Sequence, residues 1–223
     1  MMYKVLLCLL LSLFVNQLRA DQIVINQAVD KLLEEAKIIL HARGQDKINV
    51  PNLDKTIHKT IFGKIQVNGE FHSSGGLFQD LSSLHRTGDV RMNAQGNKLT
   101  LSASMGLSKL AIDFSHYSFQ LLAIHSEGNI HAECDQNAIS AEIALVHNGA
   151  TCTVELHHAQ IGTLEKFDVK MNGPGQLNEV GSLLFTWILN TFNGNLRSVI
   201  NSHIEGAIRD SLKKVDLCKM IPH

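Results

Sequence analysis

Histidine is the residue type with the most potential for chemistry, because it occurs 12 times among 223 residues. The pair His157-His158 resembles a metal motif, but neighbouring strand residues point to opposite faces of a sheet. The chain contains no Gly-x-Ser-x-Gly, His-Glu-x-x-His, phosphate-loop or Cys-x-x-Cys motif. Nothing groups its serines, histidines and aspartates into a catalytic set. We therefore expect no enzymatic activity and no cofactor.

One candidate metal site depends on how the middle of the chain folds. Three alternating runs predict a simple antiparallel meander: 122–134, 139–147 and 151–158. In that arrangement His131, Glu142 and His157 share one row on the outer face, with strands about 4.8 Å apart. Such a row could bind zinc weakly, but it lacks the closed geometry of a structural zinc site. The competing interpretation, which we favour, is a solvated polar face without metal.

The cysteines leave the disulfide pairing open. Cys134, Cys152 and Cys218 remain once an N-terminal signal segment containing Cys8 is removed. The meander pairs Cys134 with Ile139 and Cys152 with the strand end near residue 147, so Cys134 and Cys152 lie too far apart for a bridge. Cys218 could reach either of them. Three reduced thiols are the remaining alternative.

A set of inward-facing apolar side chains is the candidate ligand site. The alternating and helical spacings assign these residues to it: Leu101, Met105, Ile112, Phe114, Ile124, Ile130, Leu184, Trp187, Ile188 and Phe192. Small residues occupy other inward positions, namely Ala103, Ser126, Gly128, Ala132 and Ala141. Small side chains leave volume unfilled and methionine adapts to irregular ligands, which favours a hydrophobic cavity. The alternative is a closed core, which periodicity cannot distinguish from a cavity.

The elements that would position this site follow from the changes in period. Residues 1–20 carry an apolar run typical of a secretory signal peptide. Residues 21–223 form one predicted domain, with an amphipathic helix over 22–43, an antiparallel sheet over about 60–171 and a long helix over about 176–216. Gly44 suits the stop of the first helix.

The predicted fold class is α+β, with a strongly curved antiparallel sheet wrapped around the long C-terminal helix. The segment 180–192, "VGSLLFTWILNTF", is too short to span a bilayer and too apolar for a helix on a flat surface. A sheet with a single apolar face encloses such a helix most economically.

The charge balance excludes some partners. A formal net charge of −1 is far from the basic excess of nucleic-acid binders. We expect no transmembrane span, and the signal segment predicts a secreted, extracellular product. Lys213, Lys214 and Lys219 could hold an anionic lipid head group at a membrane or bacterial surface, but lysines near a helix end more often complement its dipole.

The stretch Gly76–Met92, "GLFQDLSSLHRTGDVRM", carries a family resemblance, together with the order of elements and the ending "AIRDSLKKV". Within it the closest matches are Leu77, Leu84, Arg86, Gly88 and Asp89. The chain resembles the group 7 mite allergens and their insect relatives. That family is similar to the tubular lipid-binding superfamily, which includes bactericidal/permeability-increasing, lipopolysaccharide-binding, juvenile-hormone-binding and takeout-like proteins.

The resemblance implies a tubular lipid-binding half-module with an apolar cavity, no enzyme activity, and a role in lipid carriage or bacterial lipid recognition in innate immunity. Juvenile-hormone binders carry an N-terminal disulfide, whereas this chain has no cysteine between Cys8 and Cys134, which argues against that branch. We predict a noncovalent binder of a lipid or other hydrophobic small molecule. The alternative is a protein-interaction or immune co-receptor module with a closed core.

Overall fold

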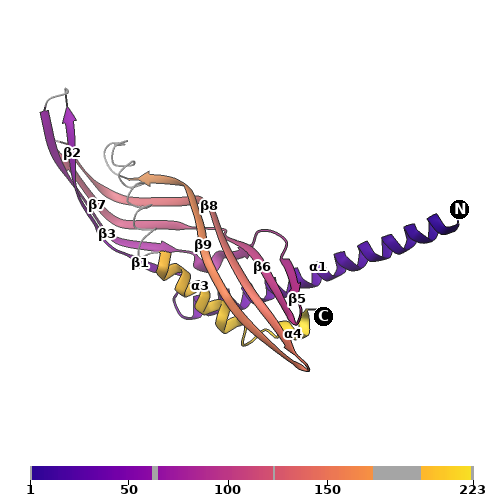
Figure 1. Cartoon of the computed structure of the whole chain (residues 1–223). Coiled ribbons are helices and arrows are strands. Elements are labelled where there is room, and N and C mark those ends of the chain that lie inside the picture. The colour runs from indigo at the N-terminus through magenta and orange to yellow at the C-terminus, as the bar shows by residue number, and fades with distance from the viewer. Residues whose placement is uncertain (1, 62–64, 123, 173–196, 222–223) are drawn as a thin grey trace.

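The computed structural model describes residues 2–61, 65–122, 124–172 and 197–221. They form an elongated α+β structure in which one antiparallel sheet curves along the molecule and helices pack against one part of it (Figure 1). The helical segments are α1 (Met2–Ala42), η1 (Leu81–Ser83), α3 (Arg197–Ser211) and α4 (Leu217–Met220). Among the helices in these residues, none is both long enough and apolar enough to cross a membrane.

Helix α1 buries the apolar stripe that its sequence predicts. The buried residues recur at helical spacing: Ile25, Ala28, Val29, Leu32, Leu33, Ala36, Ile39 and Leu40. The helix ends in a Schellman motif, in which Gly44 has φ +62° and the Gln45 N–H donates to the Leu40 carbonyl at 2.8 Å. Gly44 is therefore the stop that the sequence indicated, whereas the helix begins far earlier than residue 22.

The described residues form a nine-stranded antiparallel sheet. Its strands are β1 (Ile48–Val50), β2 (Leu53–Ile61), β3 (Ile65–Gln79), β4 (Leu84–Arg86), β5 (Arg91–Gln95), β6 (Lys98–Leu107), β7 (Ala111–Leu121), β8 (Ile124–Asn148) and β9 (Thr151–Met171). The sheet begins at Ile48, before the expected start near residue 60, because β1 and β2 both pair with β3. Residues between the predicted first helix and the predicted sheet thus supply strands.

Strand β8 is one 25-residue strand, which corrects the predicted meander. The sequence "CDQN" at 134–137 was expected to turn, but Cys134 pairs with Phe167 of β9 and not with Ile139. The second predicted hairpin is confirmed, since His147 pairs with Cys152 around the Gly149 turn. Residues 134–137 therefore continue the strand, although their types are typical of turns.

Asn137 of β8 bridges a break between the two strands that pair with β8 on one side. β6 and β7 lie end to end along β8, pairing with different halves of it. The Asn137 side chain fills the gap: its Oδ1 accepts from the Leu107 N–H at 2.6 Å, and its Nδ2 donates to the Leu107 carbonyl at 2.9 Å. The Cys134 N–H donates to the Leu110 carbonyl at 2.8 Å. An asparagine amide carries the same donor and acceptor as a peptide group, so it continues the ladder.

The last helix is shorter at its C-terminal end than predicted. Helix α3 ends at Ser211 and not at residue 216, and the part of the prediction over 176–196 lies outside the described residues. The Ser211 Oγ donates back to the Ile208 carbonyl at 2.8 Å, and the chain then turns. This turn buries Val215 and Leu217, which a continued straight helix would carry away from the core.

Side chains of α3 cover the outer edge of β9. The Asn201 Oδ1 accepts from the Ile161 N–H at 2.9 Å, and the Glu205 Oε1 accepts from the Ala159 N–H at 3.3 Å. Arg197 donates to the Ile161 carbonyl through Nε at 3.0 Å and Nη2 at 2.8 Å. These contacts fix α3 against the sheet and satisfy an edge that would otherwise pair with another chain.

Candidate functional site

The predicted inward residues on the strands lie together on the apolar face of the sheet. Five of them are each only 1% exposed and belong to one continuous core: Leu101, Met105, Ile112, Phe114 and Ile130. Ile124 pairs with Leu121, and its side chain lies outside what the structure describes, as do Leu184, Trp187, Ile188 and Phe192 entirely. The five described strand residues therefore do form part of one buried apolar face, as predicted.

An aromatic cluster that the sequence analysis missed extends this face across β3 and β7. It consists of Phe71, Phe78, Tyr117 and Phe119, all buried. Phe71 pairs with Phe119 across the two strands and stacks on Tyr117 with ring centroids 6.1 Å apart. Glycines and serines in "VNGEFHSSGGLF" weaken the alternation of β3, but Phe71 and Phe78, on either side of Gly75 with its positive φ, could have revealed it.

Helices cover only part of this sheet. We define the helical half as β4, β5 and β6 with the adjoining parts of β8 and β9. There α1 packs on β4 and η1, while α3 and α4 pack on β9. We define the aromatic half as β1, β2, β3 and β7 with residues 124–134 of β8. Within the described part of the chain, no helix packs extensively against β3 or β7.

Hydroxyl groups interrupt the apolar surface of the aromatic half. The Tyr117 hydroxyl and the Ser126 Oγ share a buried hydrogen bond of 3.0 Å. The Ser73 Oγ is fully buried and has no hydrogen-bond partner among the described residues. A buried hydroxyl without a partner costs about 1–3 kcal/mol. Besides the Tyr117 phenol and the Cys134 thiol, the buried polar side chains of the described residues are the serines Ser73, Ser126 and Ser211.

The small residues at inward positions, which were predicted to leave space for a ligand, do not all do so. Ala103, Ala132 and Ala141 are buried, as predicted. Gly128 has another role, because a Cβ there would stand 1.6 Å from the backbone oxygen of Asn172. The expectation that Gly128 leaves space for a ligand is therefore wrong, since the end of the sheet approaches it too closely.

The candidate metal row is not assembled. Because β8 runs straight through residues 134–137, His131 faces β7 and contacts Asp113 at 2.6 Å, far along the strand from Glu142. The Glu142 Oε1 instead contacts the His157 Nδ1 at 2.8 Å, and this hydrogen bond lowers the pKa of the Glu142 carboxyl. No cluster of three metal-binding side chains occurs in residues 2–61, 65–122, 124–172 and 197–221.

The family model for the group 7 allergens matches residues 24–212. The chain belongs to the group 7 allergen family. Among solved structures, a crystal structure of lipopolysaccharide binding protein is similar at 20% identity and a TM-score of 0.45, covering 84% of this chain. This chain corresponds to only 39% of that protein's chain. No curated protein matches the sequence.

The stretch that carries the family resemblance joins α1 to the sheet in this group 7 allergen. The Arg86 guanidinium donates to both carboxylate oxygens of Asp30 at 2.9 Å and to the Gly88 carbonyl at 2.7 Å. The Asp30 hydrogen bond raises the pKa of Arg86 further above its ordinary value. Leu84, in the same short strand, is fully buried. These residues therefore hold the fold together, and they lie away from the aromatic cluster.

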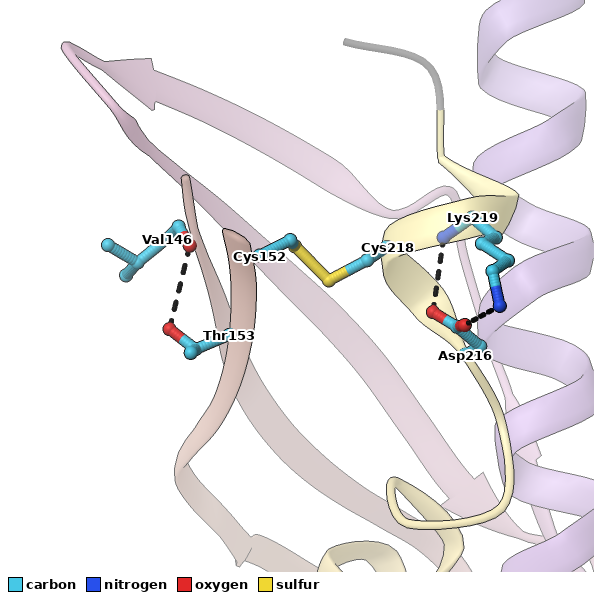
Figure 2. The surroundings of a disulfide bond; sticks show 6 residues. All are labelled: Val146, Cys152, Thr153, Asp216, Cys218 and Lys219. Atoms are coloured by element: carbon cyan, nitrogen blue, oxygen red, sulfur yellow. Dashed lines mark hydrogen bonds and ion pairs between the residues drawn. A yellow bond between two sulfur atoms is a disulfide. The ribbon is translucent and has the colours of Figure 1, made fainter. Parts of the chain in front are cut away.

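The allergen's disulfide joins Cys152, at the start of β9, to Cys218 in α4, with the Cα atoms 6.1 Å apart (Figure 2). This is one of the pairings that the sequence left open. Cys134 lies outside the bridge as a buried thiol that donates to the Gln136 carbonyl at 3.2 Å. The bridge anchors the C-terminal segment to the helical half.

The C-terminal lysines all have acidic partners. Lys213 contacts Asp210 at 2.5 Å, and Lys214 contacts Glu35 of α1 at 3.3 Å. Lys219 contacts Asp216 at 2.8 Å, and this interaction raises the pKa of the lysine (Figure 2). The arrangement favours their structural interpretation over a head-group site.

Proposed function

We propose that this group 7 allergen is a secreted, noncatalytic carrier that binds a lipid or other hydrophobic small molecule on the inner face of its curved sheet. The observation that carries the proposal is the aromatic half itself. Large buried rings there cover two adjacent strands, β3 and β7, and the described helices pack elsewhere. A tubular half-module of the kind that the family resemblance implies would enclose such a ligand.

The driving force would be desolvation. Each buried methylene group contributes about 0.8 kcal/mol, so a medium-length acyl chain supplies several kcal/mol against the entropy lost on binding. Aromatic rings provide much of the contact area at a low cost in side-chain entropy. Selectivity would then depend on the length of the face and on its few polar groups.

Extraction of the purified protein with organic solvent, followed by mass spectrometry, tests the proposal. Co-purifying lipid, or saturable uptake of a neutral fluorescent lipid by the full chain, is the expected result. Phe119→Asp should abolish uptake, because it places a carboxylate among the rings. Met92→Asp, at an exposed position of β5, is the matched control. A clean extract together with no uptake would reject the carrier function and favour the closed interaction module.

Recognition of bacterial lipid is the finer form of this proposal. Lipopolysaccharide and a neutral diacylglycerol, offered separately to the same protein, distinguish a bacterial amphiphile from a general lipid. Preference for lipopolysaccharide would support innate immune recognition. Preference for the neutral lipid would restrict the protein to carriage.

A further inference from the structure

We propose that the outer edge of β5 pairs with the same edge of a second copy of this chain, so that two sheets join across a two-fold axis. This contact lies in the helical half, apart from the face on which a ligand would bind. Its basis is the set of backbone groups that β5 leaves bare, together with the way in which that set matches itself.

The hydrogen bonding of β6 shows which backbone groups of β5 point outward. The Ser104 carbonyl of β6 accepts from the Thr87 N–H at 2.9 Å, on the side where β4 and β5 pair. Backbone groups of alternate residues in a strand point to the same side, so the even-numbered residues of β6 bond towards β5. Their partners in β5 are the odd-numbered residues. The N–H and carbonyl groups of Met92 and Ala94 therefore point away from the sheet.

Helix α1 protects this edge only where the strand begins. The Val90 N–H donates to the Asn26 Oδ1 at 3.0 Å, and the Gln22 Nε2 donates to the Val90 carbonyl at 3.0 Å. These two side chains replace a neighbouring strand, as side chains of α3 do along β9. No described residue does the same for Met92 or Ala94, and all five residues of β5 are exposed. β5 thus ends the sheet beside α1 with two bare positions (Figure 1).

β5 also lacks the side chains that usually protect a free edge. Proteins commonly guard such edges with charged residues or proline, which discourage pairing with another chain. The strand at the opposite margin of the sheet, β2, carries exposed Asp54, Lys55 and His58. In β5 the single charged residue is Arg91, and the side chain of Met92 is 45% exposed. The composition of β5 therefore permits pairing where that of β2 opposes it.

An antiparallel second copy matches this edge about a two-fold axis through Asn93. Met92 then lies opposite Ala94 of the second copy, and Ala94 lies opposite its Met92. Each of these two pairs exchanges two N–H···O bonds, so all the bare groups are satisfied. A shift of the register by two residues would instead place Ala94 opposite Val90, whose backbone groups α1 already holds.

The charges of β5 are compatible with this symmetric pairing. Arg91 lies opposite Gln95 of the second copy, and Asn93 faces its own equivalent, so like charges do not oppose each other. Only a strand with the same spacing of bare groups satisfies both edges at once, which favours a second copy over an unrelated peptide. Two strands of five residues bury little surface, so we expect a weak dimer that dissociates on dilution.

Sedimentation velocity of the purified protein over a range of concentrations tests the pairing. The mean mass should rise towards that of a dimer as the concentration increases. Ala94→Pro removes the outward N–H and should raise the dimer Kd by about tenfold or more. Proline is tolerated where the N–H of an edge strand faces solvent, so far-ultraviolet circular dichroism should show an unchanged fold.

A pair of charge variants tests the register independently of folding. Asn93→Lys and Asn93→Asp each place like charges face to face at the axis, so each variant alone should dimerise less than the parent. An equimolar mixture should restore the dimer, because opposite charges then face each other. Thr56→Lys adds the same charge to an exposed position of β2 and should dimerise as the parent does.

Three results would overturn the proposed pairing. The parent protein would remain monomeric at every concentration, or Ala94→Pro would dimerise as strongly as the parent. In the third, the mixture of the two Asn93 variants would associate no more tightly than either variant alone.

Discussion

The two halves of the sheet are stabilised in different ways. In the helical half, the disulfide, the Arg86–Asp30 ion pair and the edge contacts of α3 all join segments far apart in the sequence. The aromatic half carries stacked rings and a buried hydroxyl without a partner in the described residues. These links between distant segments are concentrated in the helical half, whereas the aromatic half carries the buried face on which we propose that a ligand binds. Changes to the helical half should therefore reduce stability while leaving ligand affinity intact.

The largest loss of stability is expected when the Cys152–Cys218 disulfide is removed. Cys152→Ser with Cys218→Ser opens a loop with a sequence separation of 66 residues, which should lower the free energy of unfolding by about 4 kcal/mol. Urea unfolding of the variant and the oxidised parent measures the difference. Fluorophore affinity, measured well below the unfolding midpoint, should not change. A loss of affinity in the still-folded variant would contradict the separation of the two halves.

Asn137 tests the junction between the halves. Asn137→Ala leaves both the N–H and the carbonyl of Leu107 without their side-chain partner, so stability should fall by about 2–3 kcal/mol. Asn129→Ala is the control, since this exposed residue also lies on β8. Urea midpoints compare the two variants. Equal, small effects would mean that Asn137 does not support the end-to-end junction of β6 and β7.

Asn201 tests the cover over the edge of β9. Asn201→Ala removes the acceptor for the Ile161 N–H, which should cost about 1–2 kcal/mol and expose part of a strand edge. Light scattering during storage should detect increased association. The exposed Ser202→Ala on the same helix should remain monodisperse under the same conditions as the parent. Unchanged scattering and stability in Asn201→Ala would show that this contact contributes nothing to edge protection.

The smallest effect on stability is expected from the His72–Asp54 pair on the outer surface of the aromatic half. The Asp54 Oδ1 accepts a hydrogen bond from the His72 Nδ1 at 2.7 Å, and this bond raises the pKa of His72 above its ordinary value of 6.5. A raised folded-state pKa stabilises the protein fully below the unfolded value, and this contribution is lost as pH rises through the folded value. Both side chains are exposed, so the change in stability should be slight.

An NMR titration of the His72 ring measures this pKa directly. Asp54→Asn should lower the midpoint. Asp168→Asn, at an exposed carboxylate of β9, is the control and should leave the midpoint unchanged. A midpoint that is insensitive to Asp54→Asn would show that the pair does not persist in solution.

Local patterns anticipated several parts of the structure for physical reasons. Alternation predicted the buried faces of β6 and β7, because a strand between core and water must alternate. The sequence indicated the turn at Gly149 and the end of the first helix at Gly44, because each position needs a positive φ, which glycine adopts easily. Alternation failed at residues 134–137, where turn-forming residues fill a gap in a neighbouring strand. It also missed the β3 aromatics, because the buried positions of β3 change from odd to even numbers around Gly75, which has a positive φ.

The sequence by itself determined the α+β class, the family and the apolar character of the inner face, because these depend on local periods and residue types. Only the tertiary structure decided that Cys152 bonds Cys218, that His131 lies apart from Glu142, and that the Tyr117 and Ser126 hydroxyls share a buried hydrogen bond. Each of those facts depends on strand register. A shift of a few residues in register leaves every local pattern intact while changing which side chains come together.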